Sequence, residues 1–152
     1  MKTGEQDERR YRSFFDNTYD AVFVCIMDER YQFDRFTEVN VPACRILGHT
    51  RDELLGMSFF DITDPADAVA LKRAAGRLCD LREVIFEVIY ITRDKRRIPV
   101  EISGRLFDHL GVPVVVSVAR DVTRRKRYEE ELKTSSRQLR NLASRIQSIR
   151  EE

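Results

Sequence analysis

The sequence has no tryptophan and holds only six glycines, four prolines, three cysteines and two histidines in 152 residues. It also lacks any apolar run near the roughly 18 residues that a membrane-spanning helix needs; its longest, Ala21 to Met27, has the length of a strand. Neither charge dominates, since 27 Lys and Arg stand against 26 Asp and Glu, which argues against a dedicated nucleic-acid-binding protein. Hydrophobic residues at 42% are enough for a packed core, which excludes global disorder.

The few residue types that bind metals or act as nucleophiles are scattered. Cys25, Cys44 and Cys79 form no CxxC pair, which gives a zinc ribbon or an iron–sulfur cluster no support. We expect the first two cysteines to be small core residues. His49 and His109 share no motif, and no nucleophile–base pair or phosphate-binding loop is visible. The expectation is therefore a chain without catalytic residues or metal ligands.

The N-terminal residues do not show the basic-then-apolar layout of a secretory signal. Because no membrane-length run is present either, we expect a cytoplasmic location for this chain. A membrane segment elsewhere in a longer parent protein stays open.

Hydrophobic periodicity and composition divide the chain into three parts: a flanking helix over residues 1–19, a globular domain over residues 20–123, and a C-terminal helix over residues 124–152. In the first part Tyr11, Phe14 and Phe15 recur at helical spacing. This stripe is expected either to pack on the sheet of its own domain or to lie in a dimer interface beside it.

The middle part combines β-rich runs with short helical segments. Asn40 and Pro42 carry the signals of a helix start and Gly48 those of its end, and Asp64-Pro65 begins a longer helix. The last β-rich run is nearly all valine, which predicts a central strand buried on both faces. The predicted strands are Ala21–Met27, Tyr31–Thr37, Val84–Thr92, Ile98–Phe107 and Val112–Ala119.

The C-terminal part contains neither glycine nor proline, and its apolar residues recur at alternating steps of four and three. Tyr128, Leu132, Leu139, Leu142, Ile146 and Ile149 form this seam, with Ser135 at one of its positions. So narrow a stripe favours a parallel coiled coil over a helix lying on a globular face. In a parallel dimer Arg145 would face Arg150 of the second copy, which is a mildly repulsive pair. We therefore expect the seam to be metastable on its own, and we expect sequence beyond residue 152 to complete the coiled coil.

Three short motifs then occur in a fixed order. They are Asn40-x-x-Ala43-Cys44-x-x-Leu47-Gly48 followed by Glu53-Leu54-x-Gly56, then Asp61-Ile62-x-Asp64-Pro65-x-Asp67, then Asp121-Val122-Thr123. Together they resemble the PAS domain signature over roughly residues 10–123. This resemblance implies an α+β fold: a five-stranded antiparallel sheet of order 2-1-5-4-3, short helices on one face, and a small pocket between helices and sheet.

The pocket that the resemblance implies is expected to be apolar, so a small apolar ligand, or a core filled by side chains, fits better than an ionic ligand. The cofactor stays unknown: the long helix carries no haem-ligating histidine, and Cys44 does not lie in a flavin-adduct motif. The expected lining residues are Val24, Ile26, Phe36, Ile46, Leu47, Leu71, Phe86, Val88, Val100, Ile102, Val116 and Val118.

PAS domains are sensory and dimerisation modules, so the resemblance implies a sensor that passes its signal from the last strand into the following helix. Asp121 and Thr123 are expected at that joint, as helix caps and as relay residues. The stretch from Leu139 to Glu152 is similar to the approach to the dimerisation helix of sensor histidine kinases, which predicts a kinase output domain in the parent protein. The alternatives are a diguanylate cyclase output and a ligand-free module for dimerisation and protein docking.

Overall fold

The computed structural model describes residues 2–151. Its elements, in chain order, are α1 (Lys2–Asn17), β1 (Ala21–Met27), β2 (Phe33–Val39), α2 (Val41–Leu47), α3 (Arg51–Leu55), α4 (Phe59–Ile62), the 3-10 turn η1 (Pro65–Asp67), α5 (Ala68–Leu81), β3 (Glu83–Ile91), β4 (Arg97–His109), β5 (Val112–Asp121) and α6 (Thr123–Glu151). The chain divides into two compact units, Met1–Asp121 and Val122–Glu152. The side chains of Tyr11 and Phe14, predicted to lie on a packed stripe, fall outside the described ones.

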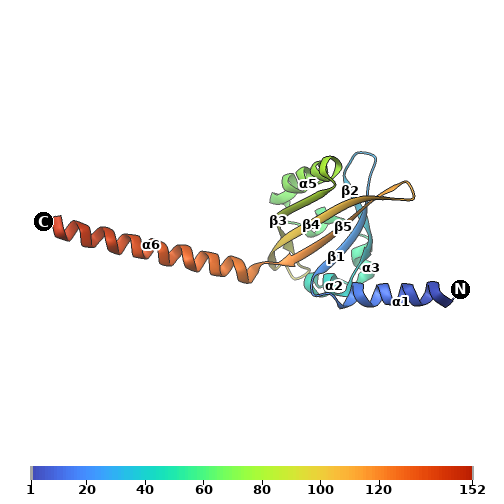
Figure 1. Cartoon of the computed structure of the whole chain (residues 1–152), viewed down its shortest axis with the longest axis horizontal. Helices are drawn as coiled ribbons and strands as arrows, with labels where there is room; N and C mark the ends of the chain where they lie inside the picture. The colour runs from blue at the N-terminus through green and yellow to red at the C-terminus, as the bar shows by residue number, and fades with distance from the viewer. Residues whose placement is uncertain (1, 152) are drawn as a thin grey trace. The chain divides into compact units, whose positions relative to one another are not determined.

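The first unit is built on an antiparallel sheet whose strand order is β2-β1-β5-β4-β3 (Figure 1). This confirms the predicted α+β fold and places the valine-rich β5 at the centre of the sheet. β4 and β5 are joined by a two-residue turn in which Leu110 and Gly111 both have positive φ, at 52° and 81°. That turn matches the right-handed twist of the paired strands.

Helices α2 to α5 cover one face of the sheet. α2 packs on β1, α3 and α4 on β2, and α5 on β3 and β4 (Figure 1). The buried core lies between these helices and the inner face of the sheet, which its strands supply with alternate residues such as Phe23, Cys25, Val100 and Ile102.

The second strand starts two residues later than the sequence pattern predicts. Tyr31 has a φ of 60°, a left-handed conformation that no strand residue adopts. The Asp28 carboxylate causes this, because its Oδ1 accepts hydrogen bonds from the backbone N–H groups of Arg30 and Gln32, both at 2.9 Å. The turn between β1 and β2 therefore consumes residues that an alternation pattern assigns to a strand.

Asn40 connects three elements of the first unit. Its side-chain oxygen accepts from the N–H of Val22 at 2.8 Å and from the N–H of Ala43 at 3.1 Å, so it ties β1 to the start of α2. Its side-chain NH2 group donates to the carbonyls of Phe15 at 2.9 Å and Asp20 at 3.0 Å, where α1 ends, and to the Thr18 hydroxyl. Asn40 is fully buried, so water cannot reach its amide, and other residues of the protein must supply its hydrogen-bond partners.

The second unit is the single 29-residue helix α6. It begins at Thr123, and in its first turn the Lys126 N–H donates to the Val122 carbonyl. None of the helices described over residues 2–151 combines the length and the hydropathy of a membrane span.

The Asn40 contacts predict a large effect of one substitution. Asn40→Ala leaves buried backbone groups of β1, α2 and the α1–β1 connection without partners, so the free energy of unfolding should fall by about 2–4 kcal/mol in urea titrations. Asn17→Ala serves as the control, because Asn17 is exposed at the end of α1 and its side chain donates to the exposed Ser13 hydroxyl; it should change stability by less than about 0.5 kcal/mol. Equal effects of the two substitutions would contradict this role of Asn40.

Candidate functional site

The space between helices and sheet is almost filled by side chains. The cavity left there has a volume of about 10 Å³, roughly that of one water molecule. It is lined by Phe33, Phe59, Leu71, Leu78, Val84, Phe86, Ile102, Gly104, Val115 and Ser117.

Eight of the twelve residues predicted to line the pocket lie at this core. Six are buried: Phe36, Leu47, Leu71, Val88, Val100 and Ile102. Two more, Ile46 and Phe86, are partly buried and pack against the same cluster. Whether these residues contact a ligand stays a prediction, but the fold does bring them together from β2, α2, α5, β3 and β4.

The other four predicted lining residues require a correction. Val24, Ile26, Val116 and Val118 lie on the outer face of the sheet, because strand side chains alternate and their neighbours point into the core. In register, Val24 is opposite Val116. β1 and β5 carry apolar residues at almost every position, so the sequence pattern did not indicate which alternate set faces the helices.

The outer face is correspondingly apolar. Six half-buried side chains of β1 and β5 form its centre: Val22, Val24, Ile26, Val114, Val116 and Val118. Towards β3 and β4 a shallow hollow of about 490 Å³ continues this surface past the exposed Ile85 and Phe107. The predicted burial of β5 on both faces is therefore complete on the helix side only.

A cluster of aromatic rings forms the centre of the core, and of its members only Phe36 was predicted to line the pocket. Phe23 lies with its ring centroid 4.9 Å from Phe36, 5.8 Å from Phe59 and 6.0 Å from Tyr90. Phe33 adds a further edge contact with Phe59 at 5.0 Å. Because β1 is apolar on both faces, the sequence pattern did not mark Phe23 and Cys25 as its inward set.

Four buried side-chain polar atoms have no hydrogen-bond partner among the described residues: Oε1 of Gln32 and the hydroxyls of Thr63, Tyr90 and Ser117. Burial raises the pKa of Tyr90 well above its ordinary value, so its hydroxyl stays neutral. Burial, with a smaller contribution from the charge of Asp34, also raises the pKa of the Cys25 thiol to about 12. Cys25 is thus an unreactive core residue, in line with the sequence-based expectation.

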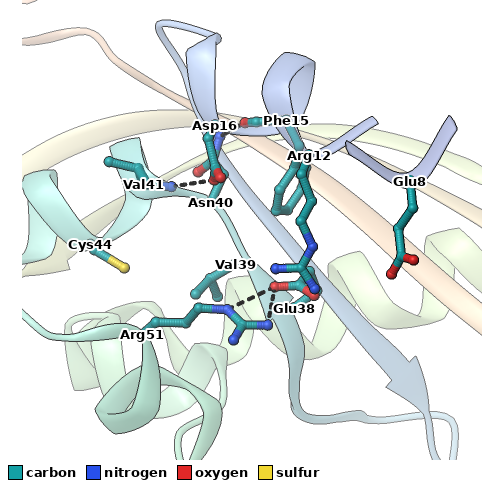
Figure 2. A pocket seen from close by; sticks show the side chains of 10 residues that line it. All are labelled: Glu8, Arg12, Phe15, Asp16, Glu38, Val39, Asn40, Val41, Cys44 and Arg51. Carbon is teal, nitrogen blue, oxygen red and sulfur yellow. Dashed lines mark hydrogen bonds and ion pairs between the residues drawn. The ribbon is translucent and has the colours of Figure 1, made fainter. Parts of the chain in front are cut away.

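A separate groove lies outside the core, between α1 and the corner formed by β2, α2 and α3. This α1 groove has a volume of about 210 Å³. Figure 2 shows its lining residues, Glu8, Arg12, Phe15, Asp16, Glu38, Val39, Asn40, Val41, Cys44 and Arg51. No sequence motif indicates this groove, because its lining residues come from four separate segments of the chain.

Several charges of the α1 groove are already engaged. The Arg51 guanidinium donates to Oε1 of Glu38 through Nε at 3.0 Å and Nη2 at 2.6 Å. Oδ1 of Asp16 accepts from the Val41 N–H at 3.1 Å, at the start of α2. Partial burial raises the pKa of the Cys44 thiol, which favours its neutral form.

His49 belongs to a surface network. Its Nδ1 lies 2.9 Å from Oε2 of Glu53, and Arg93 approaches Oε1 of the same carboxylate at 3.1 Å. The hydrogen bond from His49, followed by the charge of Arg93, lowers the pKa of Glu53. The network ties α3 to the turn after β3. No group of three His, Cys, Asp or Glu side chains in the described part of the chain is arranged to hold a metal ion.

The predicted relay residues lie at the boundary of the two units. Asp121 is the last residue of β5 and is in register with Val100 of β4, and Thr123 is the first residue of α6. Their position at the passage from strand to helix agrees with the sequence-based expectation, while their relay role stays a prediction.

The predicted dimer seam lies on one exposed stripe of α6. Its side chains are exposed by 53–72%, a high fraction for large apolar groups. They are Tyr128, Leu132, Leu139, Leu142, Ile146 and Ile149.

Comparison with known proteins identifies the fold family. The family model described as "PAS domain" matches residues 20–124. The chain belongs to the PAS domain family. Its PAS domain contains the sheet, the helices α2 to α5 and the filled core, whereas all of α1 and most of α6 lie outside the match.

Individual relatives share this domain. The chain is 28% identical over 125 residues to the methyl sulfide methyltransferase-associated sensor of Methanosarcina acetivorans, a match that covers 82% of this chain and 12% of that protein's length. The solved PAS domain of an HTR-like protein from Haloarcula marismortui is 26% identical, with a TM-score of 0.68 over 79% of this chain and 95% of that one. A domain of a sensory box sensor histidine kinase/response regulator from Geobacter sulfurreducens is 23% identical, with a TM-score of 0.63 over 76% and 94%.

The raised pKa of Cys25 predicts a pH dependence of stability. In the unfolded chain this thiol ionises near its ordinary value of 9.0, whereas in the PAS domain it keeps its proton up to about pH 12. Between these pH values ionisation favours the unfolded chain, so stability should fall by up to about 1.4 kcal/mol for each pH unit. Urea titrations of Cys25→Ala should show a shallower fall above pH 9 and a constant offset from wild type below pH 8. Parallel curves across the whole range would exclude Cys25 as the cause.

Proposed function

We propose that this chain is the PAS sensory and dimerisation module of a larger signalling protein, in which α6 joins its counterpart in a second copy. The observation that carries the proposal is the exposed apolar seam of α6, which follows directly on the PAS domain. A lone amphipathic helix of this length is marginal in water, and a parallel two-stranded coiled coil buries such a seam.

The output domain is proposed to be a two-component histidine kinase. Relatives named as sensors and as sensor histidine kinases support this, as does the resemblance of the segment from Leu139 onwards to the approach of a kinase dimerisation helix. Catalysis then belongs to the output domain, and the location is the cytoplasm. A diguanylate cyclase is the second candidate for the output.

The proposed mechanism is a population shift between two packings of the α6 pair. At the edge of the seam Arg145 faces Arg150 of the second copy, and Ser135 interrupts the apolar positions. Both features weaken the pair, so two registers can lie close in energy and a small bias from the PAS domain can select between them. Asp121 and Thr123 are proposed to transmit that bias.

The almost filled core supports a specific alternative to internal ligand binding. A cavity of about 10 Å³ has no room for an organic ligand unless side chains move, which favours either a ligand-free docking module or a sensory site elsewhere on the domain. Native mass spectrometry of the purified chain distinguishes a co-purified small molecule from an empty dimer.

The parallel seam is tested by oxidative cross-linking. Leu142→Cys places a thiol in the seam of both copies, where mild oxidation should give covalent dimers in high yield. Ser144→Cys, two residues further and on the opposite side of the helix, is the matched control and should cross-link at least about tenfold more slowly. Equal rates, or a monomer at every concentration in sedimentation equilibrium, would refute the coiled-coil dimer.

A further inference from the structure

We infer that the α1 groove binds a small zwitterion, namely a free amino acid with a short apolar side chain. This inference rests on the proposed sensory function, for which it names the site and the ligand class. The site lies outside the core, between the flanking helix and the PAS domain (Figure 2).

The first argument is space. The groove holds about 210 Å³, whereas the core cavity holds about 10 Å³. Since a water molecule occupies roughly 30 Å³ of liquid and drug-sized ligands fill about 300–1,000 Å³, the groove suits a metabolite of amino-acid size.

The second argument is the pattern of free charges. Glu8 and Arg12 lie one helical turn apart on α1 and both line the groove. Neither forms an ion pair with another residue in the described part of the chain, so a carboxylate and a guanidinium of opposite sign are both available to a ligand. A guanidinium binds a carboxylate through two parallel N–H···O bonds, and a carboxylate binds an ammonium group.

The remaining charges of the groove select against a ligand of a single sign. Glu38 is neutralised by Arg51, and Asp16 is held by the α2 backbone. With these groups engaged, Glu8 repels a simple anion and Arg12 repels a simple cation. A ligand that carries both charges can pair with each of the two.

The third argument is the apolar part of the lining. Phe15, Val39 and Cys44 contribute side chains that are buried or half-buried. The neutral Cys44 thiol adds to this apolar surface. A short aliphatic side chain on the ligand would lose its contact with water there, which adds affinity in proportion to the area covered.

The groove is also placed where binding can act on α1. Asn40 donates to the Phe15 carbonyl at 2.9 Å, and Asp16 accepts from Val41 at 3.1 Å, so two lining residues form the joint between α1 and α2. A ligand that spans α1 and this corner stabilises the docked position of α1 over any other.

The test uses the full chain labelled with 15N and titrated with L-alanine, L-valine and L-leucine up to about 10 mM. We expect amide shifts at Val41, Cys44 and Arg51, with the largest effect for leucine. 4-Methylpentanoate and 3-methylbutylamine each lack one charge of leucine, and each should bind at least about tenfold more weakly.

Variants locate the site. Arg12→Gln and Glu8→Gln should each weaken leucine binding at least about tenfold, since each removes one charge-assisted contact. Arg9→Gln is the matched control: it removes a charge from the same exposed helix but from outside the groove, and it should leave the dissociation constant unchanged.

Three results would overturn the inference: no groove shifts with any of the three amino acids, shifts confined to core amides such as Leu71 and Ile102, or equal binding of leucine and its singly charged analogues. None of them affects the cross-linking at position 142. Failure of the ligand site is therefore separable from failure of the proposed dimeric sensor.

Discussion

The arrangement of the PAS domain depends on one buried amide. Asn40 satisfies backbone groups from the end of α1, the start of β1 and the start of α2 at the same time. A buried amide with all its partners in place fixes geometry more strictly than apolar packing, because any displacement leaves polar groups unpaired in a medium without water. The position of α1, and with it the α1 groove, follows from this constraint.

Much of the fold could be predicted from the sequence, because its signals are local. Asn40, Pro42 and Gly48 mark the bounds of α2, whereas the strand order of the sheet was implied by the resemblance to the PAS signature. The face assignment of β1 and β5 was wrong for a physical reason. The two strands pair at the centre of the sheet with apolar residues on both faces, so neither phase of the alternation is marked by polar residues.

The candidate site illustrates a second limit of sequence reasoning. A pocket inside the fold is implied by the family, but the rings of Phe23, Phe59 and Tyr90 fill the centre of this core. The α1 groove lies outside that core, and its walls meet only after α1 has docked beside α2. Charges such as Glu8 and Arg12 resemble ordinary solvated helix residues in the sequence, and only their position over an apolar floor distinguishes them.

The sheet brings the entry and the exit of the PAS domain together. Ala21, the first residue of β1, is in register with Ala119 near the end of β5, and an ion pair of 3.4 Å joins Arg120 to Asp20. The Asp20 carbonyl in turn accepts from Asn40. A chain of direct contacts thus runs from the α1 groove to the last residues of β5. If the groove is the sensory site, a shift of α1 acts on β5 through the adjacent backbone. Such a shift would be enough to change the populations of the two proposed packings of the α6 pair.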